Sequence, residues 1–279
     1  MRGPLLALLL GLAGAVAADP PRIAVVLDDI GNELAAARRA LALPGPIAYA
    51  VLPATPAARW AAREAARRGR EVLLHLPMQA VEPLPLGPGG VTLDMTEGEF
   101  RRTVLADLDL VPEAVGVNNH MGSLLTRHPG AMQWLMGLLA RRGGLYFLDS
   151  RTSERSVAAR LARENGLAVL ERDVFLDPEP SRAVVSAQFD RLLELARRRG
   201  QAVAIGHPHP WTLDVLERRL GEIEAAGMRL VPPSALLARG PQQRRIPTWH
   251  ASLSPSPPAS RRSRPSPWST SSAAPAWRW

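Results

Sequence analysis

The chain of 279 residues contains no cysteine and no lysine, so every basic side chain other than histidine is arginine. Without cysteine it can form neither a disulfide framework nor a thiolate metal site. Any metal must therefore be held by nitrogen and oxygen ligands. A hydrophobic fraction of 46% is ample for a folded core, and the length allows one large domain or two small ones.

Acidic residues are absent from the C-terminal end of the chain. Residues 241–279 contain six Arg and no Asp or Glu, and Arg2 lies at the N-terminal end. The formal net charge of +8 is therefore concentrated at the two ends, and the body between them is nearly neutral. A basic groove for a phosphate backbone is not indicated, so we expect no nucleic-acid partner. The sequence identifies no protein partner.

Residues 1–18 have the pattern of a secretory signal peptide. One Arg precedes an apolar run, and residues 15–17 (Ala-Val-Ala) fit a cleavage site, with residues 16–18 as a one-residue alternative. An uncleaved membrane anchor is less favoured, because the apolar run is shorter than the roughly 20 residues that a membrane span needs. We therefore expect an exported protein, periplasmic or secreted after cleavage of the signal peptide.

From residue 241 the composition becomes rich in Pro, Ser and Arg, with no periodic pattern. Such a segment cannot bury enough apolar surface to offset the entropy lost on ordering. The expected organisation is a signal peptide over 1–18, one folded domain over 19–240 and a disordered tail over 241–279.

The middle of the chain alternates short apolar runs with amphipathic stretches. The continuous apolar runs are typical of parallel strands buried on both faces. Several amphipathic stretches end at a Gly, as helices do. We expect strands at Ile23–Leu27, Ile47–Leu52, Val72–Leu76, Ala114–Val117, Leu145–Leu148, Ala168–Leu170, Ala202–Ile205 and Met228–Val231, and helices at 33–42, 56–68, 97–109, 129–142, 155–165, 182–199 and 212–226.

Regular alternation of strands and helices predicts a parallel sheet. Seven or eight such repeats within about 215 residues favour closure into a barrel over an open, doubly wound sheet. The expected fold class is α/β, a distorted parallel (β/α)7-8 barrel in a single domain.

Polar side chains follow most of the expected strands. In a parallel barrel all strand C-termini lie on one rim, where the active sites of such folds are found. One Asp or His after a strand is often a cap or turn residue. Capping does not explain why four of the six His share this rim with several Asp. The residues are Asp28, Asp29, His75, Asn118, Asn119, His120, Asp149, Arg151, Arg172, Asp173, Asp177, His207 and His209.

Asp28 and Asp29 are adjacent carboxylates, which repel each other unless a cation or a proton lies between them. One of them can bind a metal while the other acts as a base. His75 and His120 supply neutral nitrogen donors. An Asp/His/His set suits a catalytic divalent metal, with Zn²⁺ the first expectation. Such a metal lowers the pKa of a bound water, and a further imidazole from residues 206–209 can protonate a leaving group.

Six blocks of the sequence resemble the divergent polysaccharide deacetylases, in that family's order and over roughly residues 22–238. The family belongs to the glycoside hydrolase/deacetylase superfamily, whose fold is a distorted β/α barrel. The blocks are LDDIG at 27–31, HLPM at 75–78, VNNHMGS at 117–123, DSRT at 149–152, DVFLD at 173–177 and IGHPH at 205–209.

This resemblance implies roles for most of the rim residues. Asp28 is then the catalytic base, Asp29 and His75 are metal ligands, and His207 is the general acid, with His209 as second candidate. Ordinary polysaccharide deacetylases have a second metal-binding His four residues after the first. This chain has Gln79 there, so His120 is the expected third ligand. Substrate-binding or orienting roles fall to Asn118, Asn119, Asp149, Arg151, Asp173 and His209.

The expected function is a metal-dependent carbohydrate deacetylase acting on an envelope or extracellular polysaccharide, or on a peptidoglycan-like substrate. One alternative is a catalytically inactive glycan-binding protein of the same fold, which the replacement at Gln79 motivates. Another is a different metal-dependent hydrolase, such as a glycosidase or phosphoesterase. The rim rich in His argues against a glycosidase, which needs two carboxylates flanking the scissile bond.

Overall fold

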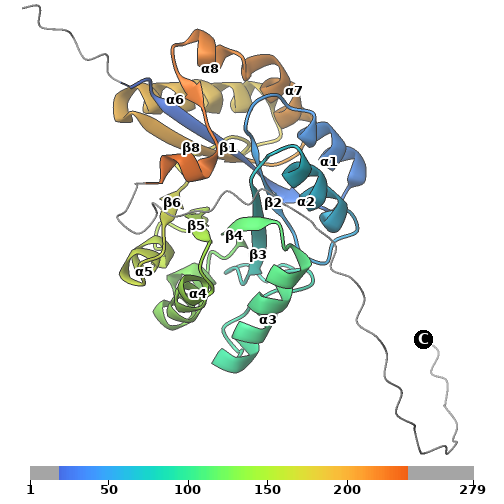
Figure 1. Cartoon of the computed structure of the whole chain (residues 1–279), viewed down its shortest axis with the longest axis vertical. Coiled ribbons are helices and arrows are strands. Elements are labelled where there is room, and N and C mark those ends of the chain that lie inside the picture. Colours follow the sequence, from blue (N-terminus) through green and yellow to red (C-terminus); the bar gives the residue numbers. More distant parts are fainter. Residues whose placement is uncertain (1–18, 238–279) are drawn as a thin grey trace, which may run out of the picture.

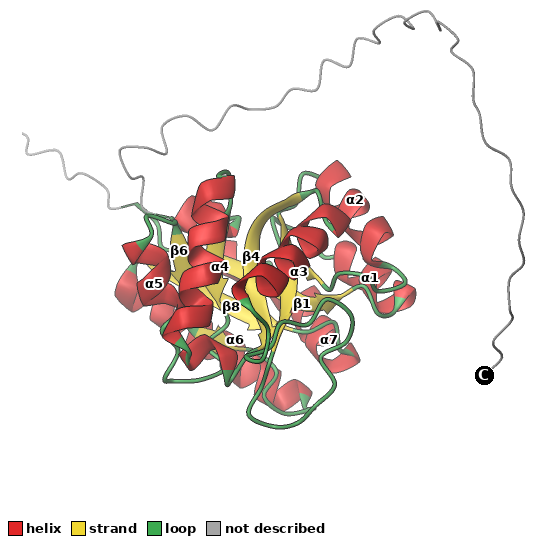
Figure 2. Ribbon diagram, turned by 90° about the horizontal axis from the view of Figure 1, so that it is seen from below, coloured by secondary structure: helices red, strands yellow, loops and turns green. Residues whose placement is uncertain are grey.

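The computed structural model describes residues 19–237. The predicted signal peptide and the predicted tail therefore lie outside the described residues. Helices surround a central set of strands (Figure 1 and Figure 2). Within residues 19–237, none of the helices combines the length and the apolar character that crossing a bilayer requires.

The strands of the described chain form one parallel sheet. Their hydrogen-bonded order is β6-β5-β4-β3-β2-β1-β8-β7, and β9 pairs with β1. The strands are β1 (Arg22–Ile30), β2 (Ala48–Val51), β3 (Val72–Met78), β4 (Ala114–Met121), β5 (Tyr146–Asp149), β6 (Val169–Glu171), β7 (Val174–Phe175), β8 (Gln201–Gly206) and β9 (Arg229–Leu230).

The two ends of this sheet are strands that follow each other in the chain. Only Arg172 and Asp173 separate β6 from β7. Arg172 donates its backbone N–H to the Asp149 carbonyl on β5, and Asp173 donates to the Val203 carbonyl on β8. These two residues therefore join the sheet edges, and the predicted distorted (β/α)7-8 barrel in one domain is confirmed. Strand β7 was not predicted, because it has only two residues.

The helices begin and end where local sequence signals place them. Thr96 and Glu99 form a capping box at the start of α3, and the Ser181 hydroxyl caps α6. Gly200 ends α6 with a φ of 77°, a conformation that favours glycine. The helices are α1 (Leu34–Leu41), α2 (Ala58–Arg67), α3 (Glu97–Leu110), α4 (Pro129–Arg142), α5 (Ala158–Glu164), α6 (Arg182–Arg199), α7 (Pro210–Arg219) and α8 (Glu222–Ala225).

One expected helix differs from the structure. The stretch predicted over 212–226 begins earlier, at Pro210, and is divided into α7 and α8. Proline fits the first position of a helix because its missing N–H would have no partner there. Gly221 stands at the break, where its low helix propensity favours an interruption.

Side chains along the strands alternate between two apolar layers. On β1, Ile23 and Val25 belong to the outer layer, which packs against the helices, whereas Ala24 and Val26 belong to a second cluster inside the barrel. The same alternation continues past the apolar residues. It places on the inner side, above this second cluster, the polar residues Asp28, His75, Asn118, Ser150, Arg172 and His207.

Helix α3 contains a buried acid with an unpaired oxygen. The Asp107 side chain is 3% exposed, and its Oδ2 has no hydrogen-bond partner in residues 19–237. A methyl group added at Gly89 would lie only 2.2 Å from its Oδ1, so the carboxylate faces the connection between β3 and α3. Burial raises the pKa of Asp107 to about 7.

We predict that Asp107→Asn stabilises the protein at alkaline pH. The pKa of the folded state exceeds the ordinary value of 3.8, so wild-type stability falls as pH rises from about 4 to about 7. Asparagine cannot ionise, so at pH 8 it should raise the free energy of unfolding by about 1–2 kcal/mol. At pH 4 the change should be small. Urea denaturation at both pH values measures this.

The control is Asp109→Asn on the same helix, whose side chain is 75% exposed and which should change stability little at either pH. An Asp107→Asn protein less stable than wild type at pH 8 would contradict the prediction.

Candidate functional site

Asp29, His75 and His120 lie on three different strands, and each directs one possible metal-ligand atom to the same place; these three residues are called the Asp29 group. Asp29 Oδ1 lies 3.1 Å from His75 Nε2 and 2.8 Å from His120 Nδ1. The three ligand atoms all lie within 4.8 Å of one another. Asp29 has a φ of 57°, so it departs from the regular strand in which neighbouring side chains point to opposite faces. This departure allows Asp28 and Asp29 to serve the same site, as the sequence predicted.

The hydrogen bonds of Asn118 determine which nitrogen of His75 carries the proton. Asn118 Nδ2 donates to Asp28 Oδ1 at 2.8 Å, and its Oδ1 lies 2.9 Å from His75 Nδ1. An amide oxygen only accepts, so in neutral His75 the proton lies on Nδ1 and Nε2 presents a lone pair to Asp29. Two lone pairs this close repel unless a cation or a proton lies between them. The donor set therefore fits a divalent metal held by nitrogen and oxygen.

The electrostatics separate the two adjacent carboxylates. Burial raises the pKa of Asp28, whose side chain is almost inaccessible, and outweighs the opposing charges of His75 and His207. Burial acts on Asp29 in the same direction, but its hydrogen bonds with His120 and His75 hold the pKa well below the ordinary range. Burial disfavours the charged form of His75, yet the charges of Asp28 and Asp29 raise its pKa. The group therefore attracts positive charge.

His207 is oriented by a buried acid. Asp177 Oδ1 lies 3.0 Å from His207 Nδ1, and Asp177 Oδ2 accepts from the His207 backbone N–H and from Thr212 Oγ1. The other ring nitrogen of His207 lies 3.9 Å from Asp29 Oδ2. Burial alone would lower the pKa of His207, but the hydrogen bond and charge of Asp177 raise it to about 9. The raised pKa favours the proton-donating form of His207, whose ring is positioned beside Asp29.

A second set of residues also has metal-ligand spacing: Asp177, His207 and His209. Both oxygens of Asp177 already accept hydrogen bonds, from the backbone, a hydroxyl and an imidazole. Asp29 Oδ1, in contrast, is a buried oxygen that has, within residues 19–237, no hydrogen-bond partner other than the two imidazoles that face it. The Asp29 group therefore fits a metal better.

The site opens into a cavity of about 360 Å³. Asn119 and Arg151, both predicted to bind substrate, are among its lining residues. The Asn119 amide is engaged by Ser150 N–H, the Met121 carbonyl and Thr152 Oγ1, and Arg151 is paired with Glu171. The remaining lining residues are Asp28, His75, His120, Met121, Ser150, Thr152, Arg172, Phe175, Ile205 and His207.

Three predicted substrate-binding residues do not line either of the two described cavities. Asn118 is fully buried between Asp28 and His75. Asp149 is buried too, and its carboxylate accepts from Arg151 N–H and Ser156 Oγ, so it holds the chain that follows β5. Asp173 binds the Val203 N–H and Arg199. In this structure these residues orient the site or the barrel and do not face a substrate.

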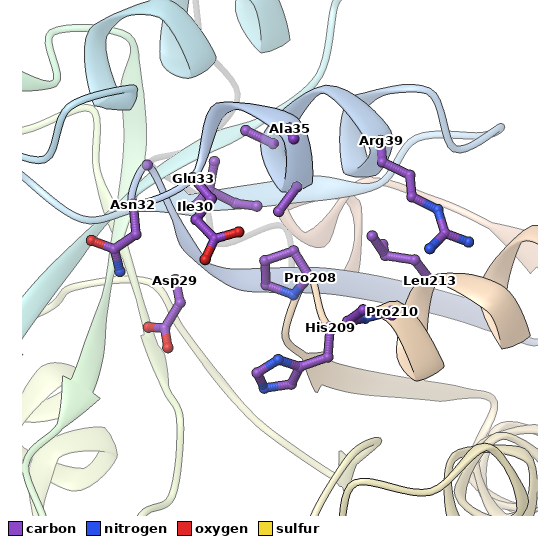
Figure 3. A pocket seen from close by; sticks show the side chains of 13 residues that line it. Asp29, Ile30, Asn32, Glu33, Ala35, Arg39, Pro208, His209, Pro210 and Leu213 are labelled. Atoms are coloured by element: carbon purple, nitrogen blue, oxygen red, sulfur yellow. The ribbon is translucent and has the colours of Figure 1, made fainter.

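A second cavity, of about 560 Å³, is lined by Asp29 and Pro208, which follow Asp28 and His207 of the first cavity in the chain. Figure 3 shows Asn32 and Glu33 on one side and Pro208 and His209 on the other. The His209 ring stacks on Trp211, with ring centroids 4.7 Å apart and planes inclined by 26°. His209 therefore belongs to this groove rather than to the Asp29 group.

Gln79 takes no part in the candidate metal group. Its Oε1 accepts from Leu93 N–H at 2.8 Å, and its backbone carbonyl accepts from Leu124 and Leu125. It therefore holds the connection between β3 and α3. His120 lies at the Asp29 group, as the sequence predicted. His128 lies outside the site: it accepts a hydrogen bond from Ala131 N–H and caps α4.

Sequence reasoning did not assign a role to Asp177 or Arg172, although it placed both at the rim. The partner of His207 could not be chosen from sequence, since Asp149, Asp173 and Asp177 all follow expected strands. Arg172 had a usable signal. It lies two residues after Leu170, a member of the inner cluster, so alternation places it on the side that faces the cavity.

Known proteins resemble this chain over most of its length. The sequence profile described as divergent polysaccharide deacetylase matches residues 25–237. An uncharacterized protein of Haemophilus influenzae is 39% identical over 227 residues, covering 77% of this chain and 81% of that one. The uncharacterized protein YibQ of Escherichia coli is 41% identical over 231 residues, covering 83% of this chain and 71% of that one.

A crystal structure of an uncharacterized Agrobacterium tumefaciens protein has the same fold. Its TM-score is 0.74 at 23% identity, and the match covers 79% of this chain and 90% of that one. The profile match spans most of the chain, and two relatives exceed one third identity over most of their length. The chain belongs to the divergent polysaccharide deacetylase family.

Proposed function

We propose that this protein is a metal-dependent hydrolase that removes acetyl groups from an envelope or extracellular polysaccharide. The observation that carries the proposal is the Asp29, His75 and His120 group, whose two imidazoles line the same cavity as Asp28 and His207. A carboxylate of raised pKa beside a protonated imidazole provides a base and an acid in the same cavity.

Different residues of the chain have different roles in acetyl hydrolysis. A divalent cation held by Asp29, His75 and His120, with Zn²⁺ the first expectation, would lower the pKa of a water and polarise the acetyl carbonyl. Asp28, held by Asn118, accepts the proton of the attacking water. His207 donates a proton to the departing amine or alcohol, while Asp177 fixes its ring.

A polymeric substrate agrees with the two neighbouring cavities. The sugar that carries the acetyl group would occupy the cavity of about 360 Å³ at the Asp29 group. The adjoining groove adds about 560 Å³ that a further part of the glycan can fill. Its Asn32 and Glu33 side chains offer hydrogen bonds to hydroxyls, and the stacked His209 ring offers an aromatic face.

We predict that the protein binds one divalent cation per chain through Asp29. Asp29→Ala should remove binding, and Asn118→Leu, which leaves His75 without its partner, should weaken it by roughly 10–100-fold. Metal content after dialysis and calorimetric titration with Zn²⁺ measure this. His209→Ala is the control and should keep one equivalent. The opposite pattern, with Asp29→Ala loaded and His209→Ala empty, would assign the metal to the Asp177 group.

Acetate release from acetylated glycans tests the catalytic roles. Asp28→Asn should lower kcat by roughly 100-fold or more on every substrate, because the attacking water loses its base. His207→Ala should lower kcat by a similar factor on acetylated sugars. On 4-nitrophenyl acetate it should have little effect, since that leaving group departs without a proton.

The two variants separate the functions under consideration. Equal losses on both substrates would show that His207 is not the acid. A wild type no faster than Asp28→Asn on any acetylated glycan would reject the hydrolase and favour the glycan-binding alternative.

We also propose that the protein is exported, which rests on the pattern of residues 1–18. The full chain produced in a bacterium should appear in the periplasm or medium with a new N-terminus at residue 18 or 19. Intact-mass and N-terminal analysis of the purified protein measure this. A chain that keeps residues 1–17 in the membrane fraction would instead support an uncleaved anchor.

A further inference from the structure

The cavity lined by His75 and His120 is also lined by Arg172, an arginine that has no acidic partner within residues 19–237. Arg172 donates from Nε to the Ser150 carbonyl at 2.7 Å and from Nη2 to the Arg151 carbonyl at 2.9 Å. Among residues 19–237 no carboxylate forms an ion pair with it, and its Nη1 makes no hydrogen bond. Arg151, in contrast, is paired with Glu171 at 2.8 Å.

The guanidinium of Arg172 is held in a fixed orientation. It lies over the Phe175 ring at 5.1 Å from the centroid, and Phe175 in turn meets the His207 ring edge-on at 5.7 Å. Two carbonyls and one aromatic face therefore restrain the guanidinium on the cavity wall, while its Nη1 remains free to donate to a ligand. A planar guanidinium held in this way binds a carboxylate with little further loss of side-chain freedom.

The surroundings leave the charge of Arg172 poorly compensated. Burial lowers its pKa, and the charge of Arg151 acts in the same direction, against the charges of Asp28 and Asp149. Asp28 and Asp29 together would balance a divalent cation, and His207 faces Asp177. Arg172 is then the cavity's unmatched positive charge, and a partly buried charge is costly until an opposite charge meets it.

We propose that Arg172 binds a carboxylate of the sugar whose acetyl group is removed, so that the substrate is an acidic acetylated sugar. The inference rests on the proposed function, because it assumes that this cavity receives the acetylated unit. It makes Arg172 a specificity-determining residue that selects a sugar bearing a carboxyl substituent over its neutral counterpart.

The test compares two probes that share a ring and an acetyl group. N-Acetylmuramic acid differs from N-acetylglucosamine by a lactyl ether with a carboxylate. Calorimetric titration of the metal-loaded full chain should show at least about 10-fold tighter binding of the acidic sugar, with a preference that declines as salt increases. Arg172→Gln should abolish the preference, and Arg172→Lys should keep part of it. Arg160→Gln, which removes a surface arginine paired with Glu164, should leave it unchanged.

Each other outcome overturns the proposal. The proposal is rejected if the wild-type protein binds both sugars equally well, whether or not acetate is released. This comparison uses the wild-type protein alone, so it does not depend on the folding of a variant. An Arg172→Gln protein that still prefers the acidic sugar rejects it as well. If that variant loses turnover equally on both sugars and keeps its binding preference, Arg172 acts on Asp28 instead. Acetate release is measured separately, so failure here and failure of the hydrolase are distinguishable.

Discussion

Two adjacent carboxylates, Asp28 and Asp29, lie near the end of the first strand, where both could be charged only against their mutual repulsion and the cost of burial. The structure separates them by their hydrogen bonds. Asp28 accepts a hydrogen bond from the buried Asn118 amide and has a raised pKa. Asp29 faces two imidazoles and has a lowered pKa. Other polar groups of the cavity hold the two histidines that lie next to these carboxylates. Asn118 fixes the proton on His75, and Asp177 fixes the ring of His207.

The backbone at the rim is strained where this arrangement requires it. Asp29, Met121 and Arg151 are non-glycine residues with φ between 50° and 57°, and they lie at the C-terminal ends of β1, β4 and β5 or just beyond. Such conformations cost energy for residues with a Cβ and persist where surrounding contacts enforce them. At Met121 the contacts are visible, since its carbonyl accepts from Asn119 and Thr152. The strain thus occurs where the side chains of the site are positioned.

Much of the architecture could be predicted from the sequence because it depends on local patterns. Continuous apolar runs marked the strands, and their shared direction predicted that Asp29, His75 and His120 would meet. Contacts set by long-range packing could not be predicted. Nothing in the sequence reveals that Gln79 holds a loop, that Asp173 holds Val203 and Arg199, or that Asp177 is the partner of His207. Strand β7 was missed because two paired residues leave no periodic signal.

The joint between β6 and β7 closes the barrel without pairing these two strands with each other. Elsewhere the barrel wall is continuous hydrogen-bonded sheet, but here the covalent chain through Arg172 and Asp173 bridges the edges. The covalent link does here what strand pairing does along the long ladders between β1 and β8 and between β3 and β4. Because Arg172 belongs to this link and also lines the cavity, a substitution there acts on the closure of the barrel and on the wall of the site together.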